Sequence, residues 1–111
     1  GNLTEARRIF VETTRAFQKD GSAIGVVVTV QYMAGLFVAA DKAEGAARLI
    51  GWADTMRAVI NDKRPLLEQA DVDRDVAASI ARIGRTAFDE AYNNGRSLSL
   101  DGAVGYALEE T

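Results

Sequence analysis

Acidic residues cluster at one place in the chain and raise the question of a metal site. Residues 71–75, DVDRD, carry aspartate at alternate positions, as the first half of an EF-hand calcium loop does. That loop also needs glycine at its sixth position and glutamate at its twelfth, where this chain has Val76 and Arg82. The pattern therefore favours acids gathered at the start of a helix, where they interact well with the helix dipole.

Catalytic chemistry lacks its usual residues in this sequence. The chain contains no histidine and no cysteine, which leaves a Ser-His triad, thiolate catalysis and cysteine-ligated zinc without their key groups. Asp89 and Glu90 are neighbours on an expected helix, and neighbouring positions on a helix do not face each other. The glycines of residues 21–25 are not followed by the Gly-Lys-Ser/Thr of a phosphate loop. We predict no enzyme, no cofactor and no metal.

Aromatic and methionine side chains suggest a different kind of site. A small-molecule pocket between two helical hairpins is one hypothesis, lined by Tyr32, Met33, Phe37, Trp52 and Met56. An open cavity there with a few convergent polar groups would favour a small-ligand sensor. A closed and fully packed space would favour an interaction domain, with the single tryptophan, Trp52, covering the edge of the core.

The element that must position these residues is residues 21–40, which contain no charged side chain. A run of about 20 apolar residues can cross a bilayer as a helix. Here glycine, serine, threonine and glutamine dilute the run, and acidic and basic residues stand at both ends. A strand over residues 24–30 would have no hairpin partner of similar character. We therefore expect a helix that other helices bury on most of its circumference, with Ser22 as its N-cap.

The rest of the chain shows helical periodicity, with apolar residues at steps of three and four. The single proline, Pro65, suits a mostly helical chain and predicts a break at residues 61–70, where Leu66 and Leu67 would pack back on the bundle. Asp71 would cap the next helix, and residues 93–95, Asn-Asn-Gly, would end it with a left-handed residue. The predicted fold class is all-α, built from antiparallel tetratricopeptide-like hairpins with five helices at residues 3–18, 22–40, 42–60, 72–93 and 100–109. Ala43, Ala47 and Gly51 are small enough to permit close helix packing.

Size and charge narrow the function classes. A chain of 111 residues is expected to form one domain, residues 1–111, as a part of a larger protein. Its formal charge of -3 disfavours a nucleic-acid-binding surface. The absence of cysteine is compatible with a cytoplasmic location.

Two segments resemble a known family. Residues 44–53, EGAARLIGWA, resemble the "AARLLGAAE" helix near the C-terminus of large bacterial ATP-binding regulators, and residues 87–104, AFDEAYNNGRSLSLDGAV, resemble their "AFAAAWAEGRALSLEEAVALAL" run. That family includes LuxR-type and MalT-like transcriptional regulators and ATPases linked to nucleotide cyclase domains. The resemblance covers residues 20–109 and implies a tetratricopeptide-like helical tail. It implies no catalytic residues, because the family's ATP site lies upstream.

The function that these features favour is a non-catalytic helical-repeat domain of a bacterial transcriptional regulator. It would bind a protein partner or transmit a signal to upstream domains. Stacked helical hairpins leave a concave surface that commonly binds partners. We also expect a homodimer formed through the first two helices.

Overall fold

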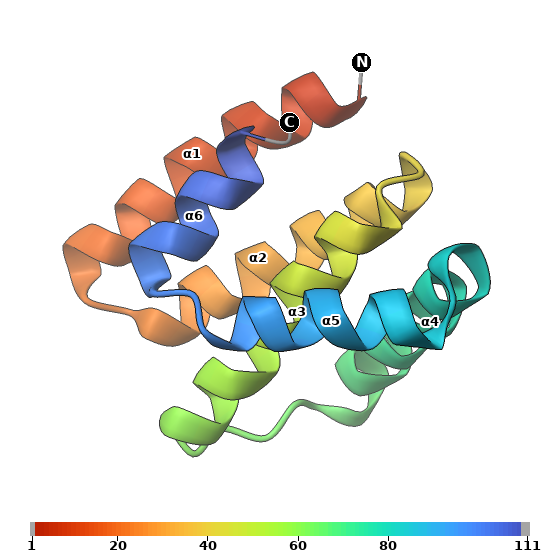
Figure 1. Cartoon of the computed structure of the whole chain (residues 1–111). Coiled ribbons are helices and arrows are strands. Elements are labelled where there is room, and N and C mark those ends of the chain that lie inside the picture. The colour runs from red at the N-terminus through yellow and green to blue at the C-terminus, as the bar shows by residue number, and fades with distance from the viewer. Residues whose placement is uncertain (1, 110–111) are drawn as a thin grey trace.

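The computed structural model describes residues 2–109, and the side chains of all of these except residues 2, 3 and 18. Within this range the chain forms helices and no strand, which confirms the all-α prediction. There are six helices, not five (Figure 1): α1 (Asn2–Asp20), α2 (Ala23–Ala39), α3 (Ala43–Val59), α4 (Leu66–Ile83), α5 (Arg85–Arg96) and α6 (Leu100–Glu109).

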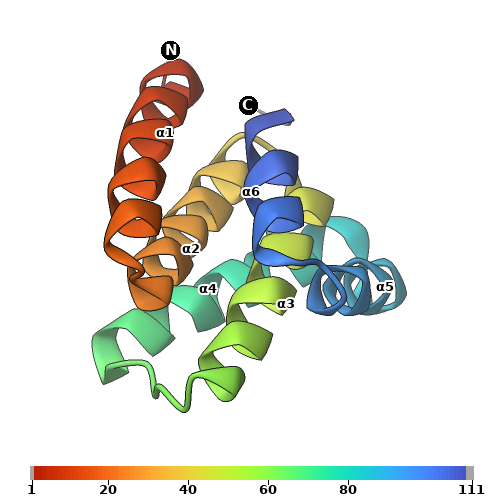
Figure 2. The same ribbon diagram turned by 90° about the vertical axis from the view of Figure 1, so that its left-hand side faces the viewer.

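Short turns connect the first three helices and reverse the chain twice. The Ser22 side chain accepts a hydrogen bond from the backbone N–H of Gly25 at 3.4 Å, so it is the N-cap of α2 as predicted. At the other end Asp41 has a positive φ of 64°, and α3 begins two residues later. As a result α1, α2 and α3 run up and down beside one another (Figure 2).

The predicted helix at residues 72–93 is wrong, because two helices, α4 and α5, take its place. They meet at Gly84, whose φ of 84° and ψ of 162° lie outside the helical region and are rarely adopted by residues with a side chain. The helix also begins earlier than predicted, at Leu66 after Pro65, so Asp71 lies inside α4 and does not cap it. Leu66 and Leu67 are 89% and 85% exposed, so they do not pack back on the bundle.

Helices α3 and α5 pack closely against each other. A Cβ atom built on Gly95 would lie 1.9 Å from the backbone oxygen of Arg48, and one built on Gly51 would lie 2.1 Å from that of Tyr92. The two helix backbones therefore touch, which confirms the role predicted for Gly51 as a small contact residue. Residues 93–95 were predicted to end the helix with a left-handed residue. The helix ends close by, at Arg96, but Gly95 is a buried helical residue of α5 and neither it nor Asn94 has a positive φ.

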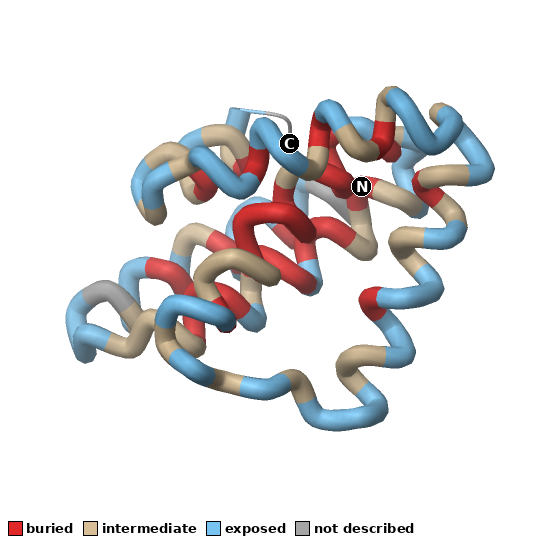
Figure 3. Tube along the Cα trace, turned by 60° about the horizontal axis from the view of Figure 1, so that its bottom comes forward, coloured by how far each residue is buried: buried red, intermediate tan, exposed pale blue. Residues whose placement is uncertain are grey.

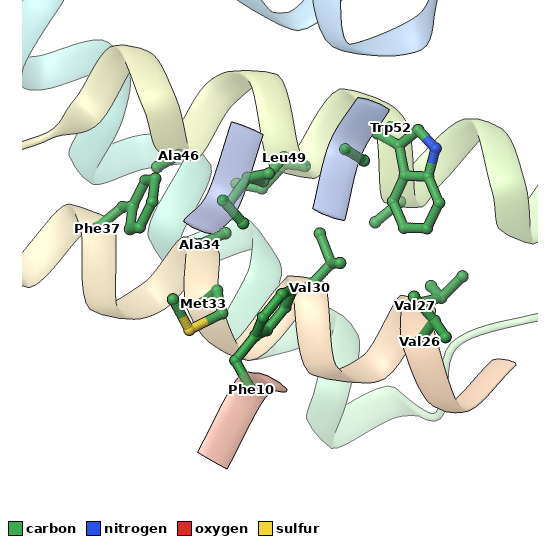
Figure 4. Close-up of a cluster of buried hydrophobic side chains, with 14 of the residues drawn as sticks. Phe10, Val26, Val27, Val30, Met33, Ala34, Phe37, Ala46, Leu49 and Trp52 are labelled. Carbon is green, nitrogen blue, oxygen red and sulfur yellow. The ribbon is translucent and has the colours of Figure 1, made fainter. Parts of the chain in front are cut away.

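The hydrophobic core lies between α1, α2 and α3. Figure 4 shows Phe10 of α1 against side chains of α2, with Leu49 and Trp52 of α3 on the other side. Ala103 and Ala107 attach α6 to the same cluster. Figure 3 shows the buried residues concentrated in the middle of the molecule, whereas α4 contributes only two buried residues, Val72 and Ser79. The uncharged segment is thus the central helix of the fold.

Among residues 2–109, no helix combines the length and the apolar character that a membrane span requires.

Candidate functional site

A groove of about 340 Å³ lies between α2 and α4. Its volume falls within the roughly 300–1,000 Å³ typical of ligand pockets. Neither helix is completely covered by its neighbours here, so side chains of both remain accessible. The residues that line the groove are Val28, Gln31, Tyr32, Gly35 and Leu36 from α2, and Glu68, Asp71, Val72, Arg74 and Asp75 from α4.

The apolar part of the groove exists because α2 is apolar on more sides than its neighbours can cover. Tyr32 is 62% exposed and Val28 is 44% exposed, although both belong to the uncharged segment. They lie one helical turn apart and so share one face of α2. Val72 of α4 lies opposite and is buried. The result is an exposed aromatic ring beside an apolar floor.

Asp75 is the unusual charged residue of the groove. Its carboxylate lies against the backbone of α2, since a Cβ atom on Gly35 would be 3.3 Å from its Oδ2. Partial burial raises the pKa of Asp75; the charge of Asp71 adds to this effect, and that of Arg74 opposes it. Among the described residues, no side chain forms a hydrogen bond or an ion pair with this carboxylate, and Arg74 pairs with Asp71 instead.

A network of buried polar residues closes one end of the groove. Gln31, only 7% exposed, accepts hydrogen bonds through its Oε1 from the Nε of Arg57 at 2.9 Å and from the Nε of Arg64 at 2.7 Å. Its amide nitrogen donates to Glu68, which also pairs with Arg57. Arg57 pairs with Asp62 as well, in the loop between α3 and α4. The two groove helices are thus joined through Arg57.

The second arginine extends this network to α5. Arg64 has a side chain only 7% exposed, and its ion pair with Asp54 measures 2.5 Å. The other carboxylate oxygen of Asp54 accepts a 2.6 Å hydrogen bond from the Tyr92 hydroxyl. The loop that carries Arg64 is therefore held between α2, α3 and α5, and it fixes where α4 begins.

The network raises the pKa of Tyr92. Burial, together with the hydrogen bond to Asp54, raises the pKa of Tyr92 from 10.0 to about 12. A raised pKa means that the folded state keeps the proton longer than the unfolded state does. Its contribution to stability is therefore complete below pH 10 and is lost as the pH rises through about 12.

We expect an ultraviolet titration of phenolate absorbance to show a late step that is absent from Tyr92→Phe. Wild-type protein should also lose stability more steeply than this variant between pH 10 and pH 12. If the titration step that Tyr92→Phe removes lies near pH 10, the hydrogen bond to Asp54 is contradicted.

The five residues of the predicted pocket do not share one space. Met33, Phe37 and Trp52 are at most 1% exposed and belong to the hydrophobic core, and Met56 packs against the same core. Tyr32 faces the groove instead. The partners of Tyr32 on α4 were not predicted. The only sequence signal for the network was an arginine, Arg57, on the apolar stripe of a predicted helix.

Within residues 2–109, the acidic side chains are not grouped as a metal site would require. No group of three metal-ligating side chains lies within binding reach of one ion in the part of the chain that the structure describes. Asp73 accepts a hydrogen bond from Gln69, and Asp89 pairs with Arg85. The spacing of residues 71–75 suggested half of a calcium loop, which Val76 and Arg82 argued against. These residues form part of helix α4.

The structure is an all-α fold with a groove between two of its helices. Comparisons with family profiles, with curated proteins and with solved structures find no match for this chain. The resemblance to bacterial ATP-binding regulators is therefore a prediction from residues 44–53 and 87–104 alone.

Proposed function

We propose that this chain is a non-catalytic interaction domain and that the α2–α4 groove receives a segment of a protein partner. The observation that carries the proposal is the exposure of Tyr32, at 62%, beside the apolar floor of the groove. Tyrosine is enriched at protein interfaces, because its ring offers a large apolar area and its hydroxyl a polar contact. In the setting that the resemblance implies, the domain is the helical tail of a larger bacterial regulator and passes a signal to upstream domains.

The groove has the rigidity that such a surface needs. Its floor is the central helix α2, which the core holds on its opposite side. Its end is fixed by Gln31 and Glu68, which both take part in the buried arginine network. A partner that binds there need not order these elements, so little binding energy is lost to conformational entropy.

A small-ligand sensor is the second candidate, favoured by the groove volume of about 340 Å³. The two candidates predict different occupants of the same surface. A sensor would bind a compound from the low-molecular-weight fraction of a cell extract, and an interaction domain would bind a protein.

Site-specific photo-crosslinking in cells tests the proposal. A photoreactive phenylalanine analogue at Tyr32 should crosslink one protein, and Val28→Glu, which adds charge to the groove, should abolish this product. The analogue at Arg15, an exposed residue of α1, is the matched control and should not give it. A product that persists in Val28→Glu, or that forms equally from both positions, would contradict the proposal.

A homodimer through α1 and α2 is a further part of this proposal. Ile9 of α1 is 44% exposed and would be available to a second copy. We expect light scattering to show a dimer at micromolar concentration and Ile9→Glu to convert it to a monomer. A wild-type protein that stays monomeric over this range would refute the dimer.

A further inference from the structure

We propose that the segment bound in the α2–α4 groove is an amphipathic helix of a partner protein, and that a lysine or arginine of this helix pairs with Asp75. This inference rests on the proposed function, because it names the chemistry of the occupant of the same groove.

The charges of the groove lead to this conclusion. Four charged residues line it, three acids and Arg74. Glu68 already pairs with the buried Arg57, and Asp71 pairs with Arg74. Asp75 alone has neither an ion pair nor a hydrogen bond with another described residue. A bound segment therefore meets one carboxylate that has neither an ion pair nor a hydrogen bond, for which a cation is the complement.

The carboxylate of Asp75 is accessible from the groove that it lines. The three heavy atoms nearest to a Cβ atom built at position 35 all belong to Asp75, with Oδ2 at 3.3 Å. Gly35 has no side chain that could cover this carboxylate, and both residues line the groove. An ammonium or guanidinium group that enters from the groove can therefore reach the carboxylate without moving α2.

The apolar residues fit a helix better than an extended strand. Val28, Tyr32 and Leu36 lie at successive turns of α2 and span about 12 Å at 1.5 Å per residue. This length matches two turns of a docked helix, whose anchor residues repeat at i, i+3 or i+4, and i+7. The groove also offers no row of unpaired backbone groups, since both its walls are helices, so an added strand would find no hydrogen-bond partners.

The ionisation of Asp75 supports the same reading of the groove. Because burial raises its pKa, the charged carboxylate is less stable here than in water. Asp75→Asn should therefore fold at least as stably as wild type at neutral pH. A partner cation would relieve this cost, and removal of the acid should weaken binding without weakening the fold.

Synthetic helices of about 14 residues provide the test, each with leucines on one face to fill the groove. Members of the set differ only at one flanking position, which is lysine, norleucine or glutamate. Binding is measured from the amide signals of Val28, Tyr32 and Gly35 in NMR titrations of the whole chain. We expect the lysine peptide to bind about three- to fivefold more tightly than the norleucine peptide, as a partly exposed ion pair would allow. Asp75→Asn should remove this difference, and Asp73→Asn, an exposed acid of the same helix, should keep it.

The outcomes separate a failure of the inference from a failure of the proposed function. Equal affinities for the three peptides would overturn the pairing with Asp75 but leave the groove as an interaction surface. If no peptide shifts the groove signals, both the inference and the proposed function of this surface are wrong. If hexylammonium alone causes the same shifts at the same concentrations, the groove is an amine site and the helix is overturned.

Discussion

Gly95→Ala is expected to destabilise the protein by about 3 kcal/mol or more, although alanine is the better helix former. The new methyl group would lie 1.9 Å from the backbone oxygen of Arg48 and 2.6 Å from its carbonyl carbon. A flexible side chain could turn away from such a clash, but backbone atoms inside α3 cannot. The whole of α5 must therefore move outward, which would loosen the contact of Phe88 and Ala91 with Ala47.

Urea denaturation measures this effect, and Gly105→Ala is its matched control. Gly105 is an exposed residue of α6, and a Cβ atom there would meet no heavy atom within 4 Å. The control should gain up to about 1 kcal/mol from helix propensity alone. If Gly95→Ala were to gain stability in the same way, α3 and α5 would not pack with their backbones in contact.

The sequence predicts the first three helices well because one physical signal dominates each of them. The uncharged segment can be soluble only if other helices cover most of it, and Ser22 marks its start with a capping hydroxyl. The turn after it follows from the charged pair at residues 41–42. Gly51 is predicted to lie at a close contact because Ala43, Ala47 and Gly51 lie one turn apart and leave room for a neighbouring helix.

The break between α4 and α5 leaves no such signal. Apolar residues at positions 76, 80, 83, 87 and 91 keep the helical period across it without interruption. They do so because Val76, Ile80 and Ile83 of α4 pack on the same small cluster as Phe88 and Ala91 of α5. A single glycine inside a periodic segment is weak evidence for a break. Only the φ of 84° at Gly84 decides it.

The groove was missed for a related reason. Periodicity assigns a residue to the apolar side of its own helix, but it does not say which helix lies opposite. Tyr32 and Met33 are adjacent in sequence, yet one lies in the groove and the other in the core. The side of α2 that faces α4 depends on where α4 begins, and that is set by contacts of Arg64 far from it in sequence.

Arg57→Met is expected to destabilise the protein by about 3–5 kcal/mol, the usual cost of removing one partner from a buried ion pair. The Arg57 side chain is only 6% exposed and pairs with both Glu68 and Asp62. Methionine has a similar length and fills the apolar part of the site, so the loss reports the charge and its hydrogen bonds. Arg85→Met is the control, because the Arg85 side chain is 73% exposed and its pair with Asp89 should contribute at most about 0.5 kcal/mol.

A double variant separates the two parts of this loss. In Arg57→Met the carboxylate of Glu68, only 27% exposed, stays behind without its guanidinium partner. Glu68→Gln removes that charge, so the double variant should be more stable than the sum of the two single losses predicts. Additive losses would mean that Arg57 stabilises the protein independently of the charge of Glu68. Because Glu68 also lines the groove, the same cycle measured with a groove-binding peptide would show whether the buried arginine supports the binding surface. If it does, Arg57→Met should weaken the peptide's affinity even under conditions where the variant is still fully folded.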